Sequence, residues 1–135
     1  MEYHDKPAPA KIQDIQEWES FFGVEMPTDL KELLLESNGP VFHTEETGKE
    51  LQFLSASEAI EYYDVYKFKE YCVNAVPISM DGCGNFVVYK LEQGRIKSIY
   101  AISSNNMGWH EAVYLKENVT EMINMEQNVE ELLFS

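Results

Sequence analysis

The stretch Pro77–Tyr100 constrains the fold of this chain most strongly. Within it, Phe86–Leu91 is rich in β-branched and aromatic residues and carries apolar side chains at both odd and even positions. A strand with two apolar faces must be covered on both sides, so we expect it inside a sheet. A second run, Arg95–Tyr100, follows a turn at Gly94 and alternates apolar with polar residues. This pattern predicts a hairpin whose second strand turns at least one face to solvent.

Amphipathic helical patterns flank this hairpin. Lys11–Phe22 repeats apolar residues at three- and four-residue steps and is followed by Gly23, which is typical of a helix end. A leucine-rich helix is predicted after Pro27, and the capping box Ser55–Glu58 predicts the start of another. Two shorter helices are expected near residues 117–125 and 128–134.

Other segments are expected to be irregular or short. Met1–Ala10 holds two prolines, so we interpret it as a flexible leader. Val41–Lys49 is predicted to be a polar loop, and Ala101–Met107 a polar connection. Short strands are expected at Leu51–Leu54 and Ala75–Ser79. The 135 residues are expected to form a single domain, a length that buries roughly two-thirds of the unfolded surface.

The charge of the chain limits its partners. It carries 24 acidic and 10 basic side chains, a formal net charge of −14. Such a protein repels nucleic acid and anionic membranes and attracts basic proteins at long range, so we expect neither nucleic acid nor membrane as a partner. Plain solubility would explain the same charge. Oligomeric state is left open by these features.

Cysteine content and apolar patterning indicate the compartment. Cys72 and Cys83 make neither a disulfide framework nor a zinc-binding spacing. No apolar run reaches the length of a bilayer span, and the first residues lack the basic and then apolar layout of a signal peptide. We therefore expect a cytoplasmic protein.

The order of these features resembles the SMI1/KNR4 family, also called the SUKH superfamily. The resemblance runs from about Ile12 to Phe134 and rests on the joint order of several motifs, none of which is specific alone. Met26 in place of a commoner leucine and Cys83 inside the glycine-rich bend are modest departures. The motifs are the helix ending at Gly23, Met26–Leu30, Asn38-Gly39, Leu54–Ala59, Asp81–Phe86, the Gly94 turn and the acidic C-terminal helix.

The resemblance implies an α+β fold with a mixed, mostly antiparallel β-sheet and helices packed against it. Bacterial members are mostly immunity proteins that bind and neutralise polymorphic or contact-dependent toxins, often nucleases. Eukaryotic members act as regulatory interaction proteins. We therefore expect an immunity protein whose partner is a basic toxin domain. The alternative is a regulatory or scaffold protein-binding module without a toxin.

Candidate contact residues follow from the basic character of nuclease active sites, which an acidic protein can occupy by imitating nucleic acid charge. The candidate anchors are Tyr62 and Tyr66, which core packing would equally explain. A solvated helix face would likewise explain the helical carboxylates among the candidates. The acidic candidates are Glu45, Glu46 and Glu50 in the loop and Glu58, Glu61 and Asp64 on the third helix.

Enzyme and metal interpretations have little support in the sequence. Cys83 and His110 could form a nucleophile and base, but nothing in their spacing brings them together. Asp81–Asn85 resembles a calcium loop only superficially, because the downstream bidentate glutamate is missing. The family contributes no catalytic motif. We expect no enzymatic activity, no cofactor and no metal.

Overall fold

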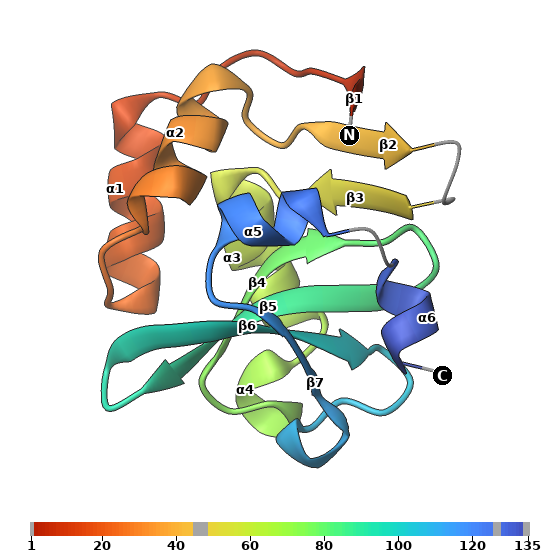
Figure 1. Cartoon of the computed structure of the whole chain (residues 1–135). Helices are drawn as coiled ribbons and strands as arrows, with labels where there is room; N and C mark the ends of the chain where they lie inside the picture. The colour runs from red at the N-terminus through yellow and green to blue at the C-terminus, as the bar shows by residue number, and fades with distance from the viewer. Residues whose placement is uncertain (1, 45–48, 126–127, 134–135) are drawn as a thin grey trace.

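The structure is a computed structural model that describes residues 2–44, 49–125 and 128–133. Its seven strands form one sheet in sequence order, and each strand pairs antiparallel with the next (Figure 1). The strands are β1 (Glu2–Asp5), β2 (Val41–Thr44), β3 (Lys49–Phe53), β4 (Ala75–Met80), β5 (Asn85–Glu92), β6 (Arg95–Ser103) and β7 (Val113–Lys116).

Helices occupy the connections and the C-terminal part of the chain. They are α1 (Ile12–Phe22), α2 (Thr28–Glu36), α3 (Ala56–Val65), α4 (Phe68–Tyr71), α5 (Val119–Asn124), α6 (Val129–Leu133) and the 3₁₀ turn η1 (Trp109–Glu111). In Figure 1, α5 and α6 lie in front of the sheet and α3 and α4 behind it. The α+β class is confirmed, and every strand pairing in the described ranges is antiparallel.

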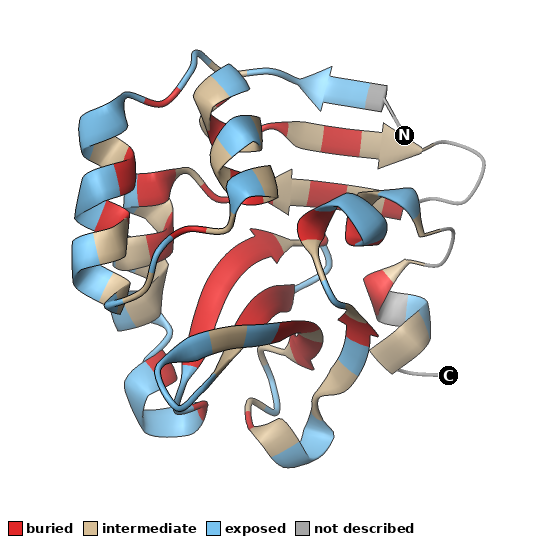
Figure 2. Ribbon diagram, turned by 60° about the vertical axis from the view of Figure 1, so that its left-hand side comes forward, coloured by how far each residue is buried: buried red, intermediate tan, exposed pale blue. Residues whose placement is uncertain are grey.

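Strand β5 lies in the interior of the sheet, as its two apolar faces predict. It pairs with β4 on one side and β6 on the other. Val87 and Tyr89 point into one core, and Phe86 and Val88 point into another. Figure 2 shows β4 and β5 buried along most of their length. Full burial of one such side chain contributes roughly 1.5–3 kcal/mol, so β5 anchors both layers.

The two cores differ in size. The larger core contains Val87 and Tyr89 of β5 and takes buried side chains from α1, α2, α3, α5 and α6. Trp18 is its largest fully buried side chain. The smaller core lies on the opposite face and consists of Phe68, Cys72, Ala75, Phe86, Val88 and Ile102.

Local signals set the helix ends. Gly23 adopts the left-handed conformation (φ 71°), and its amide donates to the Glu19 carbonyl, which closes α1. At the start of α3, the Ser55 hydroxyl accepts from the Glu58 amide (3.1 Å). The Glu58 carboxylate in turn accepts from the Ser55 amide (2.9 Å), so the predicted capping box is confirmed.

The expected polar loop Val41–Lys49 is wrong over most of its length. Val41–Thr44 forms β2, and Lys49 begins β3. Phe42 is buried and its ring packs 5.8 Å from the ring of Phe53. Outer strands of a sheet tolerate polar residues. They are stabilised by pairing with a neighbouring strand, and the composition of the segment itself does not reveal that partner.

The polar connection expected from Ala101 also begins later than predicted. β6 continues to Ser103, because Ala101 and Ile102 are buried opposite Val87 and Phe86 of β5. Pairing with a strand that has two apolar faces therefore extends the hairpin by three residues beyond the expected Tyr100.

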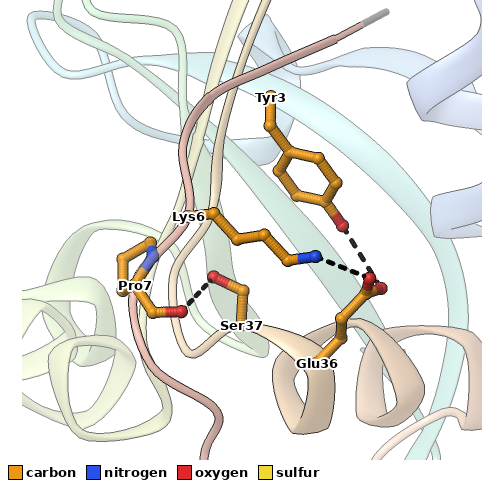
Figure 3. Close-up of polar contacts among 5 residues, drawn as sticks. All are labelled: Tyr3, Lys6, Pro7, Glu36 and Ser37. Carbon is orange, nitrogen blue, oxygen red and sulfur yellow. Dashed lines mark hydrogen bonds and ion pairs between the residues drawn. The ribbon is translucent and has the colours of Figure 1, made fainter.

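The expected flexible leader carries an edge strand. β1 pairs with β2, and side chains tie this segment to the end of α2 (Figure 3). The Lys6 ammonium lies 2.9 Å from a Glu36 carboxylate oxygen, and the Tyr3 hydroxyl donates to the other oxygen (3.3 Å). The Ser37 hydroxyl donates to the Pro7 carbonyl (2.7 Å). These partners lie about 30 residues away in sequence, so composition alone could not predict them.

Candidate protein-binding surface

Five of the predicted contact residues belong to helix α3: four lie on the helix and Tyr66 is its C-cap. Ser55 starts the helix, and the half-buried Glu58 satisfies a backbone donor there. Glu58 therefore has a structural role at the helix start. Its carboxylate also lies close to Gly39, where a Cβ atom would be 3.6 Å from Glu58 Oε1.

Glu61 and Asp64 are exposed on the outer side of α3, next to the exposed Val65. We call these three residues the α3 ridge. Their three-residue spacing places the two carboxylates near each other along the helix surface. Within the described part of the chain, neither carboxylate forms a hydrogen bond or ion pair. The charge of the ridge is thus available to a partner.

The two predicted anchors differ in burial. Tyr62 is half-buried and packs against both cores. Burial, with a smaller contribution from the Glu58 carboxylate, raises the pKa of its hydroxyl. Tyr66 is 37% exposed, and its ring meets those of Phe86 (4.7 Å) and Tyr62 (5.7 Å) edge-on. Core packing therefore accounts for much of Tyr62, whereas Tyr66 is fixed on one side and accessible on the other.

The loop carboxylates are not joined to the α3 ridge by any described contact. Glu45 and Glu46 lie outside the described residues. Glu50 is half-buried on β3 and accepts a hydrogen bond from the Gln52 side chain. It lies beside the bend at Gly82, where a Cβ atom would approach Glu50 Oε1 to 3.0 Å. The predicted surface thus separates into the α3 ridge with Tyr66 and a distinct position at Glu50.

A second acidic surface was not predicted. Between α2 and α5 lies a groove of about 270 Å³ that is lined by apolar residues of both helices and by three carboxylates of α2. The Asp29 carboxylate accepts from the Thr120 amide (3.1 Å) and hydroxyl (3.3 Å), which ties the two helices together. We call this the acidic groove; its lining includes Asp29, Glu32, Leu33, Glu36, Val119, Thr120, Ile123 and Asn124.

The α2 side of this groove could be recognised in the sequence, whereas the α5 side could not. The three carboxylates of α2 recur at three- and four-residue steps, which places them along one side of the helix. Its opposite wall on α5 comes from a segment 91 residues further along the chain than Asp29. That wall is apparent only from the tertiary structure.

A buried cation holds α5 in place. The Lys49 side chain is 1% exposed, and its ammonium donates to the carbonyls of Met122 (3.0 Å), Ile123 (3.2 Å) and Met125 (2.6 Å). A cation at a helix C-terminus satisfies carbonyls that lack helical partners. Burial lowers the pKa of Lys49 to about 8.

The residues considered for catalysis or metal binding have other environments. Asp81 Oδ1 accepts from the amides of Cys83 (2.8 Å) and Asn85 (3.1 Å), so this carboxylate closes the glycine-rich bend. Cys83 and His110 are exposed. Within residues 2–44, 49–125 and 128–133, no group of three or more His, Cys, Asp or Glu residues is arranged to hold a metal ion.

The described helices are all too short or too polar to cross a bilayer. A family model described as the SMI1 / KNR4 family (SUKH-1) matches residues 9–125. The chain belongs to this family. No curated protein matches the sequence. The segment that matches the SMI1/KNR4 model includes α2, α3 and α5, so both acidic surfaces are built on the family fold, whereas β1 and α6 lie outside it.

Proposed function

We propose that this SMI1/KNR4 protein is an immunity protein: a stoichiometric inhibitor that binds a cognate toxin domain in the cytoplasm of the producing cell. It acts by binding and catalyses no reaction. The observation that carries the proposal is the combination of family membership with a net charge of −14. Bacterial members of the resembled family mostly have this role.

The charge supports a basic partner, and a nuclease toxin is the class that fits best. A nuclease must hold phosphates, so its active site presents basic side chains. Exposed carboxylates on the α3 ridge, and Glu32 in the acidic groove, attract such a site over a Debye length, about 8 Å at physiological ionic strength. This attraction accelerates encounter and favours a basic partner over acidic competitors.

The contact residues have separate roles in this proposal. Glu61 and Asp64 steer the partner because their charge is exposed. Tyr66 anchors it, because its ring is held by Phe86 and loses little freedom on binding. Glu58 and Tyr62 support the surface from within.

Co-expression with the product of the adjacent gene tests the proposal. We expect a one-to-one complex that co-purifies at low salt, inhibition of the partner's activity, and association that slows as ionic strength rises. A partner without toxin activity that still forms a one-to-one complex would favour the regulatory or scaffold role. Recovery of no basic partner at low salt would contradict both the charge argument and the immunity function.

A further inference from the structure

The acidic groove between α2 and α5 differs in charge from other cavities of the molecule. Of the eight described residues that line it, three are acidic and none is basic. Lys31, the lysine of α2, is not among them. Three other cavities formed by described residues have linings whose charges sum to zero or to a single positive charge. The groove therefore combines a cavity with a net negative lining.

Only part of this charge is offset within the chain. Glu32 is exposed and forms no hydrogen bond or ion pair with another residue that the structure describes. Asp29 accepts hydrogen bonds from Thr120, and these leave its negative charge in place. The Lys6 ammonium lies 2.9 Å from Glu36. Three carboxylates less one ammonium leave a formal charge of −2 at the groove.

The Lys6 contact shows which chemistry a carboxylate of this groove accepts. Lys6 belongs to the N-terminal segment, and Figure 3 shows its side chain converging with that of Tyr3 on Glu36. A cation from outside α2 and α5 thus already pairs with one of the three lining carboxylates. The other two, Asp29 and Glu32, form no ion pair with a described base.

Apolar side chains complete the lining. Leu33 of α2 and Ile123 of α5 are half-buried, so each presents apolar surface beside the carboxylates. At about 270 Å³, the groove is smaller than the pockets that enclose whole small-molecule ligands, roughly 300–1,000 Å³. Its size therefore favours single side chains of a polypeptide segment over an enclosed small molecule.

The two walls of the groove are held together before a ligand binds. The hydrogen bonds from Thr120 to Asp29 join α5 to α2. The Asn124 side chain donates to the Thr120 carbonyl (3.0 Å), and the Lys49 ammonium donates to the Ile123 carbonyl (3.2 Å). A wall fixed in this way loses little conformational freedom when a ligand side chain enters.

We propose that the acidic groove docks a polypeptide segment in which one bulky apolar side chain is flanked by lysine or arginine. The apolar side chain packs against Leu33 and Ile123, and the basic side chains meet Glu32 and Asp29. Charge complementarity selects this occupant, because the lining is negative and no described base lines it. The inference goes beyond the immunity function, since the α3 ridge lies on another helix and the groove needs no toxin to bind such a segment.

Nuclear magnetic resonance titration of the full chain at physiological ionic strength tests this docking site. The probe is a synthetic peptide in which one leucine is flanked on each side by two lysines. Two matched peptides replace the leucine by alanine or the lysines by glutamates. We expect shifts at Glu32, Leu33 and Ile123 with the first peptide, and affinity at least about fivefold weaker with either control.

Matched variants localise the effect. Glu32→Gln is expected to weaken binding of the basic leucine peptide about fivefold, whereas Glu17→Gln removes an exposed charge of α1 and should change affinity by less than about twofold. Ile123→Ala is expected to weaken binding about fivefold. Ile12→Ala, at an isoleucine of α1 that is 57% exposed, should change it by less than about twofold. Circular dichroism checks that each variant is folded.

Lys6→Ala should have the opposite sign. Removal of this ammonium leaves Glu36 without its ion pair, so affinity for the basic leucine peptide should rise about threefold. Lys69→Ala makes the same change in net charge at an exposed position of α4, outside the groove lining. It should raise affinity by less than about 1.5-fold.

Any of four results would overturn the proposal. These are no shift with the basic leucine peptide at millimolar concentration, equal binding of the alanine peptide, equal effects of Glu32→Gln and Glu17→Gln, and weaker binding after Lys6→Ala. The titration contains no toxin, so failure of this docking site and failure of the immunity function are distinguishable.

Discussion

The two faces of the sheet differ in how thickly they are covered. Among the described residues, 22 buried apolar side chains form the larger core and six form the smaller one. Four of the large apolar side chains that remain exposed, Val65, Tyr66, Tyr71 and Val73, lie on or beside α3 and α4, next to the smaller core. Half of the eight exposed large apolar side chains among the described residues thus lie on the thinly covered face.

Because of this difference, we expect the larger core to contribute most of the stability and the thinly covered face to contribute more to partner binding. The larger core joins side chains of five helices with those of β2 to β7 and holds most of the buried apolar residues. Helix α4 is held mainly by Phe68 and by Cys72 at its C-cap, so it can adjust or open locally at low cost. We therefore expect core substitutions on the two faces to have different consequences, and contacts with the toxin partner to concentrate near α3 and α4.

The largest effect is expected from removing an aromatic side chain from either core. Trp18→Ala should lower the free energy of unfolding near the upper end of about 3–5 kcal/mol, and Phe68→Ala near the lower end. The thin cover over Phe68 can collapse into the void, whereas the neighbours of Trp18 are fixed. Urea unfolding measures both values, and equal losses would contradict the comparison.

Hydrogen exchange sharpens the same comparison. With Phe68→Ala, amides of α4 should exchange faster while those of β5 keep most of their protection. With Trp18→Ala, protection should fall throughout the described strands and helices. Uniform loss in both variants would mean that the two faces unfold as one unit.

The next effect is a pH dependence of the free energy of unfolding, which should have opposite sign for Lys49 and for Cys72. The pKa of Lys49 is about 8 in the folded protein and about 10.5 in the unfolded chain, so the unfolded state binds more protons between these values. Stability should therefore rise with pH between about 8 and 10.5, by up to about 3 kcal/mol, because the side chain is buried and one pKa unit corresponds to about 1.4 kcal/mol. Lys49→Met should remove this rise, although it also leaves carbonyls of α5 without their donor.

Cys72 should act in the other direction. Burial raises the pKa of its thiol from 9 to about 11, so the unfolded chain loses this proton first. Stability should fall as pH rises through about 9 to 11, which opposes the Lys49 effect above pH 9. Cys72→Ala should remove the part of the fall that begins near pH 9 and leave the rise from pH 8. Chemical denaturation across this pH range, in both variants, separates the two groups.

A smaller effect is expected on association. Glu61→Lys combined with Asp64→Lys should slow binding to the basic partner recovered by co-purification about tenfold at low ionic strength. The dissociation rate should change little. Glu17→Lys combined with Glu25→Lys makes the same change in net charge at exposed positions on α1 and just after it, outside the α3 ridge, and should slow association only about twofold. Equal slowing in both pairs, measured by stopped flow, would show that net charge alone steers the partner.

The smallest effect is expected at the sheet edge. Lys6→Ala removes the ammonium that holds the pKa of Glu36 below its usual value. Amides of β1 should then exchange several-fold faster, while global stability stays unchanged because the pair is exposed. In the wild type the Glu36 contribution should be lost as pH falls through its lowered pKa. Unchanged exchange would mean that β1 is held by pairing with β2 alone.

The candidate site was predictable in part. Glu61, Asp64 and Tyr66 lie where the spacing of α3 suggests, at or near an exposed side of the helix. Glu58 was also a candidate, but its position in the capping box indicates the structural role that it has. The acidic groove needed α5 to lie against α2, which the sequence does not indicate.

The sequence by itself determined the features that depend on a few neighbouring residues. The two apolar faces of β5, the turn at Gly94, the end of α1 at Gly23 and the capping box of α3 all follow from side-chain alternation, permissive glycine and local hydrogen bonds. Their partners lie within a few residues, so propensity and pattern are sufficient.

Only the tertiary structure decided which distant segments meet. β1 is fixed by contacts to α2 about 30 residues away, and the ammonium of Lys49 finds its carbonyls more than 70 residues further on. A polar strand or a lysine carries no local signal of such a partner, because the energy that places it belongs to the other segment. For the same reason, the acidic groove could be found only in the folded protein.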